Sequence, residues 1–235
     1  MQQRVSDSSE AEDKSADPAN PDLARIETWI FDLDNTLYAP SHRLLDKITE
    51  RMTHYMMREL GIGRPAAERL RNTYFARHGI TLTGLIEKHG VDHTHFLEDV
   101  HDIDLGRLRP DPALNAAIGA LRARGKRLII HTNGARGHAE RVLDRLQLSD
   151  AFHAVYAIED KALRPKPSVE AYARVLAADG FDPAGAAMIE DTVVNLKVPK
   201  DLGMTTVWLC HHEGEKAPAH VDYRITQLTA FLRAI

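Results

Sequence analysis

The sequence lacks several features that would place it in a specialised class of proteins. A single cysteine, Cys210, excludes an internal disulfide and a cysteine-rich zinc site, which suits a reducing cytoplasm. No apolar run approaches the length of a membrane-spanning helix. The net charge of −4 gives no signature of polyanion binding. We therefore expect a cytoplasmic protein whose partners include neither a membrane nor a nucleic-acid polymer.

The first 24 residues also lack the apolar segment of a secretory signal. They are polar and acidic, and they contain too few large apolar side chains to offset the entropy lost on ordering. The sequence predicts a disordered tail over residues 1–24, to which we assign no role.

Short apolar runs alternate with helical patterns through most of the remaining chain. The runs occupy residues 28–32, 126–132, 153–159, 186–191 and 205–210, and the helical patterns occupy residues 111–125, 137–148, 168–180 and 192–203. Several runs are apolar throughout, as expected of strands that are covered on both faces. This alternation predicts an α/β fold with a Rossmann-like, doubly wound parallel sheet.

Residues 41–109 interrupt the alternation with helical patterns alone. Apolar residues recur near helical spacing from Leu44 to Leu60, and further helices are predicted at residues 65–77, 81–89 and 94–100. An insertion after the first strand should lie above the carboxyl ends of the strands, where such sheets bind ligands. We therefore expect an α/β core, formed by residues 25–40 and 110–235, and an all-helical cap, formed by residues 41–109.

Polar residues that could carry chemistry follow four of the predicted strands. The stretch FDLDNT places Asp32 and Asp34 directly after the first apolar run. An Asx-type turn is one explanation of this pattern. The other is a catalytic pair, with Asp32 as a covalent nucleophile and Asp34 as general acid and then general base.

The stretch IIHTNGARG ends the second run with Thr132 and Asn133. A strand followed by an Asn-Gly turn explains it in structural terms. Alternatively, the Thr132 hydroxyl and nearby backbone N–H groups form a cradle for an anion. The stretch RPKPSV presents Lys166 between two prolines, which would hold an ammonium rigidly beside phosphate oxygens if it is not a solvated loop lysine.

Glu190 and Asp191 end the fourth run, and a helical pattern follows. Asp191 could cap that helix, or the two carboxylates could bind Mg²⁺, which prefers oxygen ligands. All these stretches end predicted strands of one sheet, so they could converge at one edge. Carboxylates, a hydroxyl and a fixed lysine are the groups that Mg²⁺-assisted phosphoryl transfer requires.

The order FDLDNT, HTN, RPKP, IEDTVVN resembles the haloacid dehalogenase superfamily of phosphohydrolases, and the resemblance covers residues 28–210. The helical insertion is similar to that superfamily's first type of cap. The segments FDLDNTLY, TYFARHGITLTGL, HDIDLGRLRPDP and NLKVPKDLGMTTVWL look most like the pyrimidine 5′-nucleotidase branch.

The resemblance implies a role for each motif residue. Asp32 becomes an aspartyl phosphate, while Asp34 transfers protons and its backbone carbonyl helps to bind Mg²⁺. Thr132 and Asn133 hold phosphate oxygens, and Lys166 bridges the nucleophile and the phosphate. Asp32, Asp34 and Asp191 form the metal site, Glu190 contributes directly or through water, and Asn195 supports this group from the following helix.

The expected substrate is a small phosphorylated metabolite, with a pyrimidine nucleoside 5′-monophosphate as the first candidate and a sugar phosphate or phosphoglycolate-like ester as the alternative. A phosphomutase and a non-catalytic binding module are further alternatives. A dehalogenase is disfavoured, because its reaction has no ester oxygen for Asp34 to protonate. The protein could act as a monomer or as a homodimer.

Two further predictions concern local structure. Pro199 lies inside a helical pattern and predicts a break near residues 197–200. In the insertion, the turn around residues 77–84 is expected to face the substrate. The candidate contacts there are Tyr74, Phe75, Arg77, His78 and Thr81, with Gly79 and Gly84 allowing close approach of the backbone and core packing as the alternative for the two aromatic residues.

Overall fold

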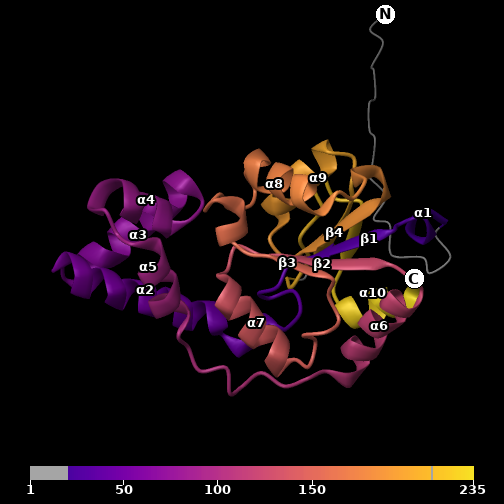
Figure 1. Ribbon diagram of the computed structural model, residues 1–235, viewed down its shortest axis with the longest axis horizontal. Coiled ribbons are helices and arrows are strands. Elements are labelled where there is room, and N and C mark those ends of the chain that lie inside the picture. Colours follow the sequence, from indigo (N-terminus) through magenta and orange to yellow (C-terminus); the bar gives the residue numbers. More distant parts are fainter. Residues whose placement is uncertain (1–20, 213) are drawn as a thin grey trace, which may run out of the picture.

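The computed structural model describes residues 21–212 and 214–235, which are arranged around a six-stranded parallel sheet (Figure 1). The strands are β1 (Thr28–Phe31), β2 (Arg127–His131), β3 (Ala154–Tyr156), β4 (Ala186–Glu190), β5 (Thr205–Leu209) and β6 (Tyr223–Ile225). Their order is β3-β2-β1-β4-β5-β6, and every neighbouring pair is parallel. The predicted Rossmann-like α/β sheet is confirmed.

Helices connect the strands on both sides of the sheet. The α-helices are α1 (Pro21–Ala24), α2 (Leu44–Leu60), α3 (Arg64–His78), α4 (Thr81–His89), α5 (His93–His101), α6 (Pro112–Ala123), α7 (Arg136–Arg145), α8 (Val169–Asp179), α9 (Lys197–Asp201) and α10 (Leu228–Ala234). Short 3₁₀-helices are η1 (Pro40–His42), η2 (Glu159–Lys161), η3 (Pro183–Gly185) and η4 (Val193–Leu196).

The two faces of the sheet are buried against different helices, because successive strand residues point to opposite faces. In β1, Trp29 and Phe31 belong to one apolar cluster, which also contains buried residues of α6, α7 and α10. Ile30 belongs to a second cluster with Val175 of α8. Figure 1 shows α8 and α9 on one side of the sheet and α6, α7 and α10 on the other. This double cover explains why the strands are almost uniformly apolar.

The helices α2–α5 lie together to one side of the sheet (Figure 1). They pack on one another through residues such as Tyr55 and Phe96, whose ring centroids lie 5.0 Å apart. Gly61 ends α2 in a left-handed conformation with φ of 64°, which glycine adopts without steric cost. The helices α2–α5 of the segment between β1 and β2 therefore pack on one another beside the sheet, whereas α6 of the same segment packs on one face of it.

The structure differs from the sequence predictions at several positions. The strand β6 and the helix α10 have no counterpart among them, and the third strand is shorter than predicted. The predicted disordered tail lies outside the described residues up to residue 20, whereas residues 21–24 form α1 and Leu23 is buried. None of the helices within residues 21–212 and 214–235 has both the length and the apolar character that a membrane crossing requires.

The predicted break near Pro199 is confirmed. The segment after β4 consists of η4, which ends at Leu196, followed by α9, which begins at Lys197. Pro199 is thus in the first turn of α9, where a helix has no internal partner for a backbone N–H. The carbonyl of Asn195 instead accepts a hydrogen bond from the Tyr172 hydroxyl at 2.5 Å.

Candidate active site

Three adjacent central strands bring the predicted residues to one edge of the sheet. Asp32 directly follows β1, Thr132 directly follows β2, and Glu190 is the last residue of β4. Because β2, β1 and β4 are neighbours and parallel, their carboxyl ends lie side by side. The topology therefore places at one location residues that are more than 150 positions apart in sequence.

Asp32 is anchored through both of its carboxylate oxygens. Its Oδ1 accepts a hydrogen bond from Lys166 Nζ at 2.6 Å, and its Oδ2 accepts one from the Thr36 hydroxyl at 3.0 Å. The same Nζ donates to Glu190 Oε2 at 2.6 Å. All three charged side chains are buried, with Lys166 3% exposed. The single ammonium group of Lys166 thus donates hydrogen bonds to the carboxylates of both Asp32 and Glu190.

This imbalance of charge affects the protonation of the group. Burial and the negative charge of Glu190 raise the pKa of Asp32 to about 7, against the opposing effect of Lys166. Burial likewise raises the pKa of Glu190 to about 7, although Lys166 opposes it. Burial acts to lower the pKa of Lys166, but the two carboxylates outweigh it and raise that pKa above its ordinary range. A second cation at this location would stabilise both carboxylates in their charged form.

Asp191 completes a cluster of ligands that suits such a cation. Carboxylate oxygens of Asp32, Glu190 and Asp191 all lie within 4.8 Å of one another. Burial raises the pKa of Asp191, and the charge of Asp32 adds to this effect. Glu190 already accepts hydrogen bonds at both oxygens, from Lys166 Nζ and from the backbone N–H of Thr192 at 3.1 Å. The donor set of the three carboxylates fits a hard divalent ion, and Asp191 is the one whose oxygens accept no hydrogen bond from Lys166.

Asp34 lies in a different environment from Asp32. Its Oδ1 accepts hydrogen bonds from His138 Nε2 at 2.7 Å and from the Tyr38 hydroxyl at 2.5 Å. Burial acts to raise the pKa of Asp34, but the charge of His138 and the two hydrogen bonds outweigh it and lower the pKa below its usual value. The two aspartates therefore differ in their partners and in the direction of their pKa shifts.

Thr132 and Gly134 form the floor of the site beside Asp34. Thr132 is 1% exposed, and its Oγ1 accepts a hydrogen bond from the backbone N–H of Gly134 at 2.9 Å. A Cβ atom at Gly134 would lie 3.3 Å from that Oγ1, 3.4 Å from Asp34 Oδ2 and 3.2 Å from His138 Cδ2. The absence of a side chain at Gly134 thus leaves space where these three residues meet.

Asn133 makes contacts that the sequence did not predict. Its side-chain amide hydrogen-bonds to the backbone of Lys166 on both sides, accepting from the N–H at 2.8 Å and donating to the carbonyl at 3.1 Å. A phosphate contact from Asn133 would therefore come from its main chain. The predicted supporting role of Asn195 stays a prediction, since its hydrogen bonds are made by its main chain: its N–H donates to the Thr192 carbonyl at 2.9 Å, and its carbonyl accepts from Tyr172.

Besides Thr36 and Thr192, three residues that contact the site were missed by the sequence analysis. Lys161 is fully buried, and its Nζ donates to the Thr132 carbonyl at 2.6 Å and to Asn133 Oδ1 at 3.1 Å. Burial lowers the pKa of Lys161 well below its usual value, and the nearby charge of Lys166 adds to that effect. The other two are Tyr38 and His138, which hold Asp34. His138 lies in the first turn of the helix after Thr132, and that position was the one available signal.

The turn of the insertion reaches the rim of the site, but several of its candidate contacts face elsewhere. A Cβ atom at Gly79 would lie 3.3 Å from Cγ of Pro165, beside Lys166. Thr81 is 4% exposed, and its hydroxyl donates to the carbonyl of Arg71 at 3.4 Å. Its predicted contact with the substrate is therefore wrong in this structure.

The same correction applies to Gly84. A Cβ atom there would lie 2.3 Å from the ring of Tyr74, so the close approach is to this ring and not to a ligand. Tyr74 itself is 8% exposed and hydrogen-bonds through its hydroxyl to His89 at 2.8 Å. Core packing, the alternative for Tyr74, is what the structure shows. Phe75 is 61% exposed.

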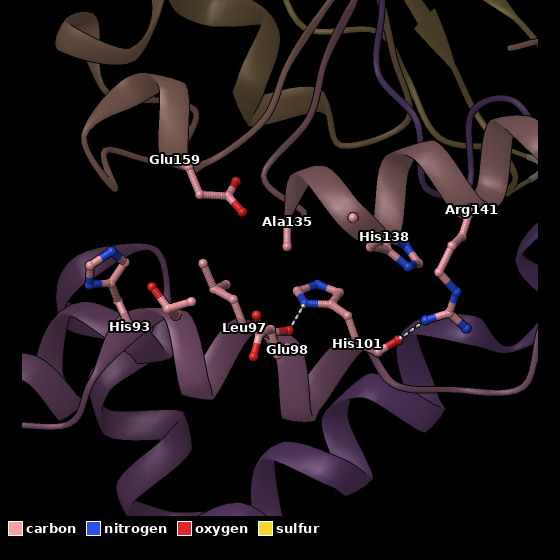
Figure 2. A pocket seen from close by; sticks show the side chains of 10 residues that line it. His93, Leu97, Glu98, His101, Ala135, His138, Arg141 and Glu159 are labelled. Atoms are coloured by element: carbon pink, nitrogen blue, oxygen red, sulfur yellow. Dashed lines mark hydrogen bonds between the residues drawn. The ribbon is translucent and has the colours of Figure 1, made fainter.

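A cavity of about 340 Å³ separates α5 from the loop and helix that follow β2 (Figure 2). We call it the α5–α7 cavity. It is lined by His93, Thr94, Leu97, Glu98, His101, Ala135, Gly137, His138, Arg141 and Glu159. Figure 2 shows side chains of α5 pointing toward α7 and toward Glu159. Because His138 also contacts Asp34, the cavity adjoins the Asp34 side of the site.

Comparisons with known proteins agree with this architecture. A family model described as a haloacid dehalogenase-like hydrolase matches residues 26–203. Phosphate metabolism protein 8 of Saccharomyces cerevisiae is 28% identical over 199 residues, which are 79% of this chain. The chain spans 61% of the length of that relative.

Solved structures support the fold at low sequence identity. A HAD phosphatase from Thermococcus onnurineus matches with a TM-score of 0.60 and 22% identity, over 88% of this chain and 96% of its own. L-2-haloacid dehalogenase from Xanthobacter autotrophicus, with chloropropionic acid covalently bound, matches with a TM-score of 0.54 and 18% identity, over 88% and 97% of the two chains. The fold is thus similar to that of proteins with different reactions.

Proposed function

The chain belongs to the haloacid dehalogenase-like hydrolase family, and we propose that it is a Mg²⁺-dependent phosphomonoester hydrolase acting through an aspartyl phosphate on Asp32. The observation that carries this proposal is the pair of unlike carboxylates after β1. Asp32 is held by Lys166, whereas Asp34 is held at one oxygen by His138 and Tyr38. A nucleophile and a separate proton carrier require such different surroundings.

The residues account for both halves of a hydrolysis. An oxygen of Asp32 attacks phosphorus and forms a new P–O bond as the bond to the leaving oxygen breaks. Asp34 enters this step in its protonated form and gives its proton to the leaving oxygen. Asp34 then takes a proton from a water molecule as the water oxygen attacks phosphorus. The bond to Asp32 breaks, phosphate is released, and both aspartates return to their starting states. Lys166 stays beside Asp32 throughout and offsets negative charge.

Mg²⁺ would be held by the carboxylates of Asp32 and Asp191 and by the backbone carbonyl of Asp34. Glu190 orients this group through Lys166 and Thr192. When bound, the ion supplies positive charge that offsets the repulsion between these carboxylates and an anionic phosphate. Thr132 contributes its hydroxyl, and Asn133 its main chain, to binding the phosphate oxygens.

The leaving group is the part of the substrate that the core motifs do not contact. We propose that residues 41–109 act as a cap over the core of residues 25–40 and 110–235 and select that leaving group. The position of Gly79 beside Pro165 and the α5–α7 cavity support this role. The substrate that we propose is a pyrimidine nucleoside 5′-monophosphate, on the strength of the motif resemblance.

The test is the release of phosphate from a panel of esters in the presence and absence of Mg²⁺. The panel contains UMP, CMP, glucose 6-phosphate, phosphoglycolate and p-nitrophenyl phosphate, with 2-chloropropionate as a probe of halide release. We expect Mg²⁺-dependent hydrolysis that EDTA abolishes and that is fastest with UMP or CMP. Hydrolysis that persists without Mg²⁺, or release of halide alone, would contradict the proposed reaction. A preference for another ester would contradict only the proposed substrate.

A further inference from the structure

The two carboxylate oxygens of Asp34 have different surroundings. Oδ1 accepts both of the hydrogen bonds described above, from His138 Nε2 and from the Tyr38 hydroxyl. Oδ2 lies 3.4 Å from the Cβ position of Gly134, which is itself 3.3 Å from the hydroxyl of Thr132. Oδ1 is therefore the anchored oxygen, and Oδ2 is the one that faces the floor of the site.

The contact with Asp34 is the hydrogen bond that fixes the His138 ring. The side chain of His138 has no exposed surface, and its Nδ1 has no hydrogen-bond partner within the described part of the chain. Oδ1 of Asp34 accepts this bond whether the carboxyl is ionised or carries a proton on Oδ2, so Nε2 carries the hydrogen. Burying an imidazole nitrogen without a hydrogen-bond partner costs free energy of folding. That His138 is nevertheless buried here indicates that its contact with Asp34 has a function.

His101 holds His138 from the side of the insertion. The two ring centroids are 4.9 Å apart with an interplanar angle of 35°. The Nδ1 of His101 bonds to the carbonyl of Leu97 at 2.8 Å, and the His101 carbonyl accepts from Arg141 of α7 at 3.0 Å (Figure 2). The last turn of α5 is therefore hydrogen-bonded to α7, the helix that contains His138.

We infer that His138 is a positioning residue for Asp34, that it turns Oδ2 toward the leaving oxygen, and that His101 braces it from the insertion. This inference rests on the proposed function, because it assigns a purpose to the proton carrier of that reaction. It concerns how the carboxyl is aimed, and it requires no contact between His138 and the substrate. It also connects the insertion to Asp34, because His101 of the insertion packs on the ring of His138.

The experiment compares His138→Gln with His138→Met. The two replacements have similar volumes, but only glutamine can donate a hydrogen bond to Asp34. Each variant is assayed with p-nitrophenyl phosphate, whose leaving group needs little protonation, and with UMP, whose alkoxide leaving group needs a proton. Thermal unfolding of both variants is recorded alongside.

We expect His138→Met to lower kcat/KM for UMP by about 10²–10³-fold and kcat/KM for p-nitrophenyl phosphate by less than about 10-fold. The quantity compared is kcat/KM, because it reports the steps up to the departure of the leaving group and not the later hydrolysis of the aspartyl phosphate, which both substrates share. His138→Gln should recover most of the loss on UMP. His101→Leu should shift the ratio of the two kcat/KM values in the same direction as His138→Met, but less.

Equal losses of kcat/KM on both substrates in His138→Met would overturn the inference while leaving the proposed function intact. If His138→Met fails to fold, the glutamine variant decides, because an altered ratio of the two kcat/KM values there would show that a donor at this position does not suffice. Absence of phosphate release by the wild-type protein from every ester would overturn the proposed function and the inference together.

Discussion

The side-chain amide of Asn133 lies against the backbone of Lys166, with its oxygen 2.8 Å from the Lys166 nitrogen and its nitrogen 3.1 Å from the Lys166 carbonyl oxygen. An amide is the side chain that can accept and donate in this way at once. Lys161 reaches the same amide oxygen from the interior. The ammonium of Lys166 is thus placed between Asp32 and Glu190 by contacts that begin at the end of β2. Asn133 and Lys161 therefore act on Asp32 through Lys166.

The two aspartates after β1 should respond differently to the loss of charge. Asp32→Asn should abolish turnover, because an amide cannot form the acyl phosphate. Asp34→Asn should lower kcat by about 10²–10⁴-fold while binding of phosphate is retained, since it removes the proton carrier only. Steady-state rates, together with inhibition by inorganic phosphate, check both effects. Near-normal turnover by Asp32→Asn would exclude the covalent mechanism.

Gly134 should be required for activity more than for stability. A Cβ atom there would press on His138, Thr132 and Asp34 at 3.2–3.4 Å, so these groups would have to move by a few tenths of an ångström. We expect Gly134→Ala to lower kcat/KM by about 10–10²-fold, because small displacements of reacting groups are costly. The matched control is Gly185→Ala, where a Cβ atom meets nothing within 4 Å and kcat/KM should not change. An unchanged kcat/KM in Gly134→Ala would show that the three groups tolerate the displacement.

Gly84 should be required for the stability of the insertion. In Gly84→Ala the new methyl group would meet the buried Tyr74 ring at 2.3 Å, and such overpacking destabilises proteins by about 1–3 kcal/mol. Gly119→Ala in α6 meets nothing within 4 Å and should raise the free energy of unfolding by about 0.5–1 kcal/mol. Urea unfolding of the two variants measures the difference. A stabilised Gly84→Ala protein would mean that the ring of Tyr74 is free to move aside.

The ion pair between Arg127 and Asp179 should make stability depend on pH. Asp179 accepts two hydrogen bonds from Arg127 at 2.7 Å and one from the Tyr156 hydroxyl at 2.9 Å. Burial acts to raise the pKa of Asp179, but these contacts outweigh it and lower the pKa. A folded-state pKa below the unfolded value of about 4 stabilises the fold above that pH, and this stabilisation is lost as the pH falls through the folded-state pKa.

Asp179→Asn should therefore lower Tm at pH 7, and the difference from the wild-type protein should shrink below about pH 4. Differential scanning calorimetry at pH 7, 5 and 3 measures it. Glu170→Gln, which changes an acidic residue at the exposed start of the same helix, α8, serves as the control and should show a small, nearly constant difference. A Tm difference for Asp179→Asn that is the same at every pH would show that the carboxylate is not stabilised by Arg127.

Much of the fold and of the site could be predicted because the signals are local. Apolar runs that end in polar residues identify strand ends, and parallel strands bring their ends to one edge, so Asp32, Thr132 and Glu190 could be grouped from sequence alone. The short edge strand β6 was missed because three residues, Tyr223–Ile225, carry almost no periodic signal.

The remaining contacts depend on which side chains meet across long separations. The partner of Asp34, His138, is 104 positions away, and no local pattern indicates their contact. The fully buried Lys161 follows two acidic residues and has the appearance of a solvated lysine in sequence. Gly84 and Thr81 were assigned to a ligand because a glycine or a threonine in a turn does not reveal which neighbour occupies the adjacent space. In the structure, the ring of Tyr74 occupies it at Gly84.

The register of β1 has a consequence for how the protein acquires its activity. Thr28 pairs with Arg127 on one side and with Ala186 on the other, so the central strand is closed by two long loops. Closing long loops costs chain entropy, and folds with distant contacts form slowly. In the first loop, the packed helices α2–α5 shorten the flexible chain that has to be closed, because their own contacts already bring its ends nearer. During refolding from denaturant, secondary structure in the insertion should therefore return before catalytic turnover, which has to wait for the pairing of β1 with β4.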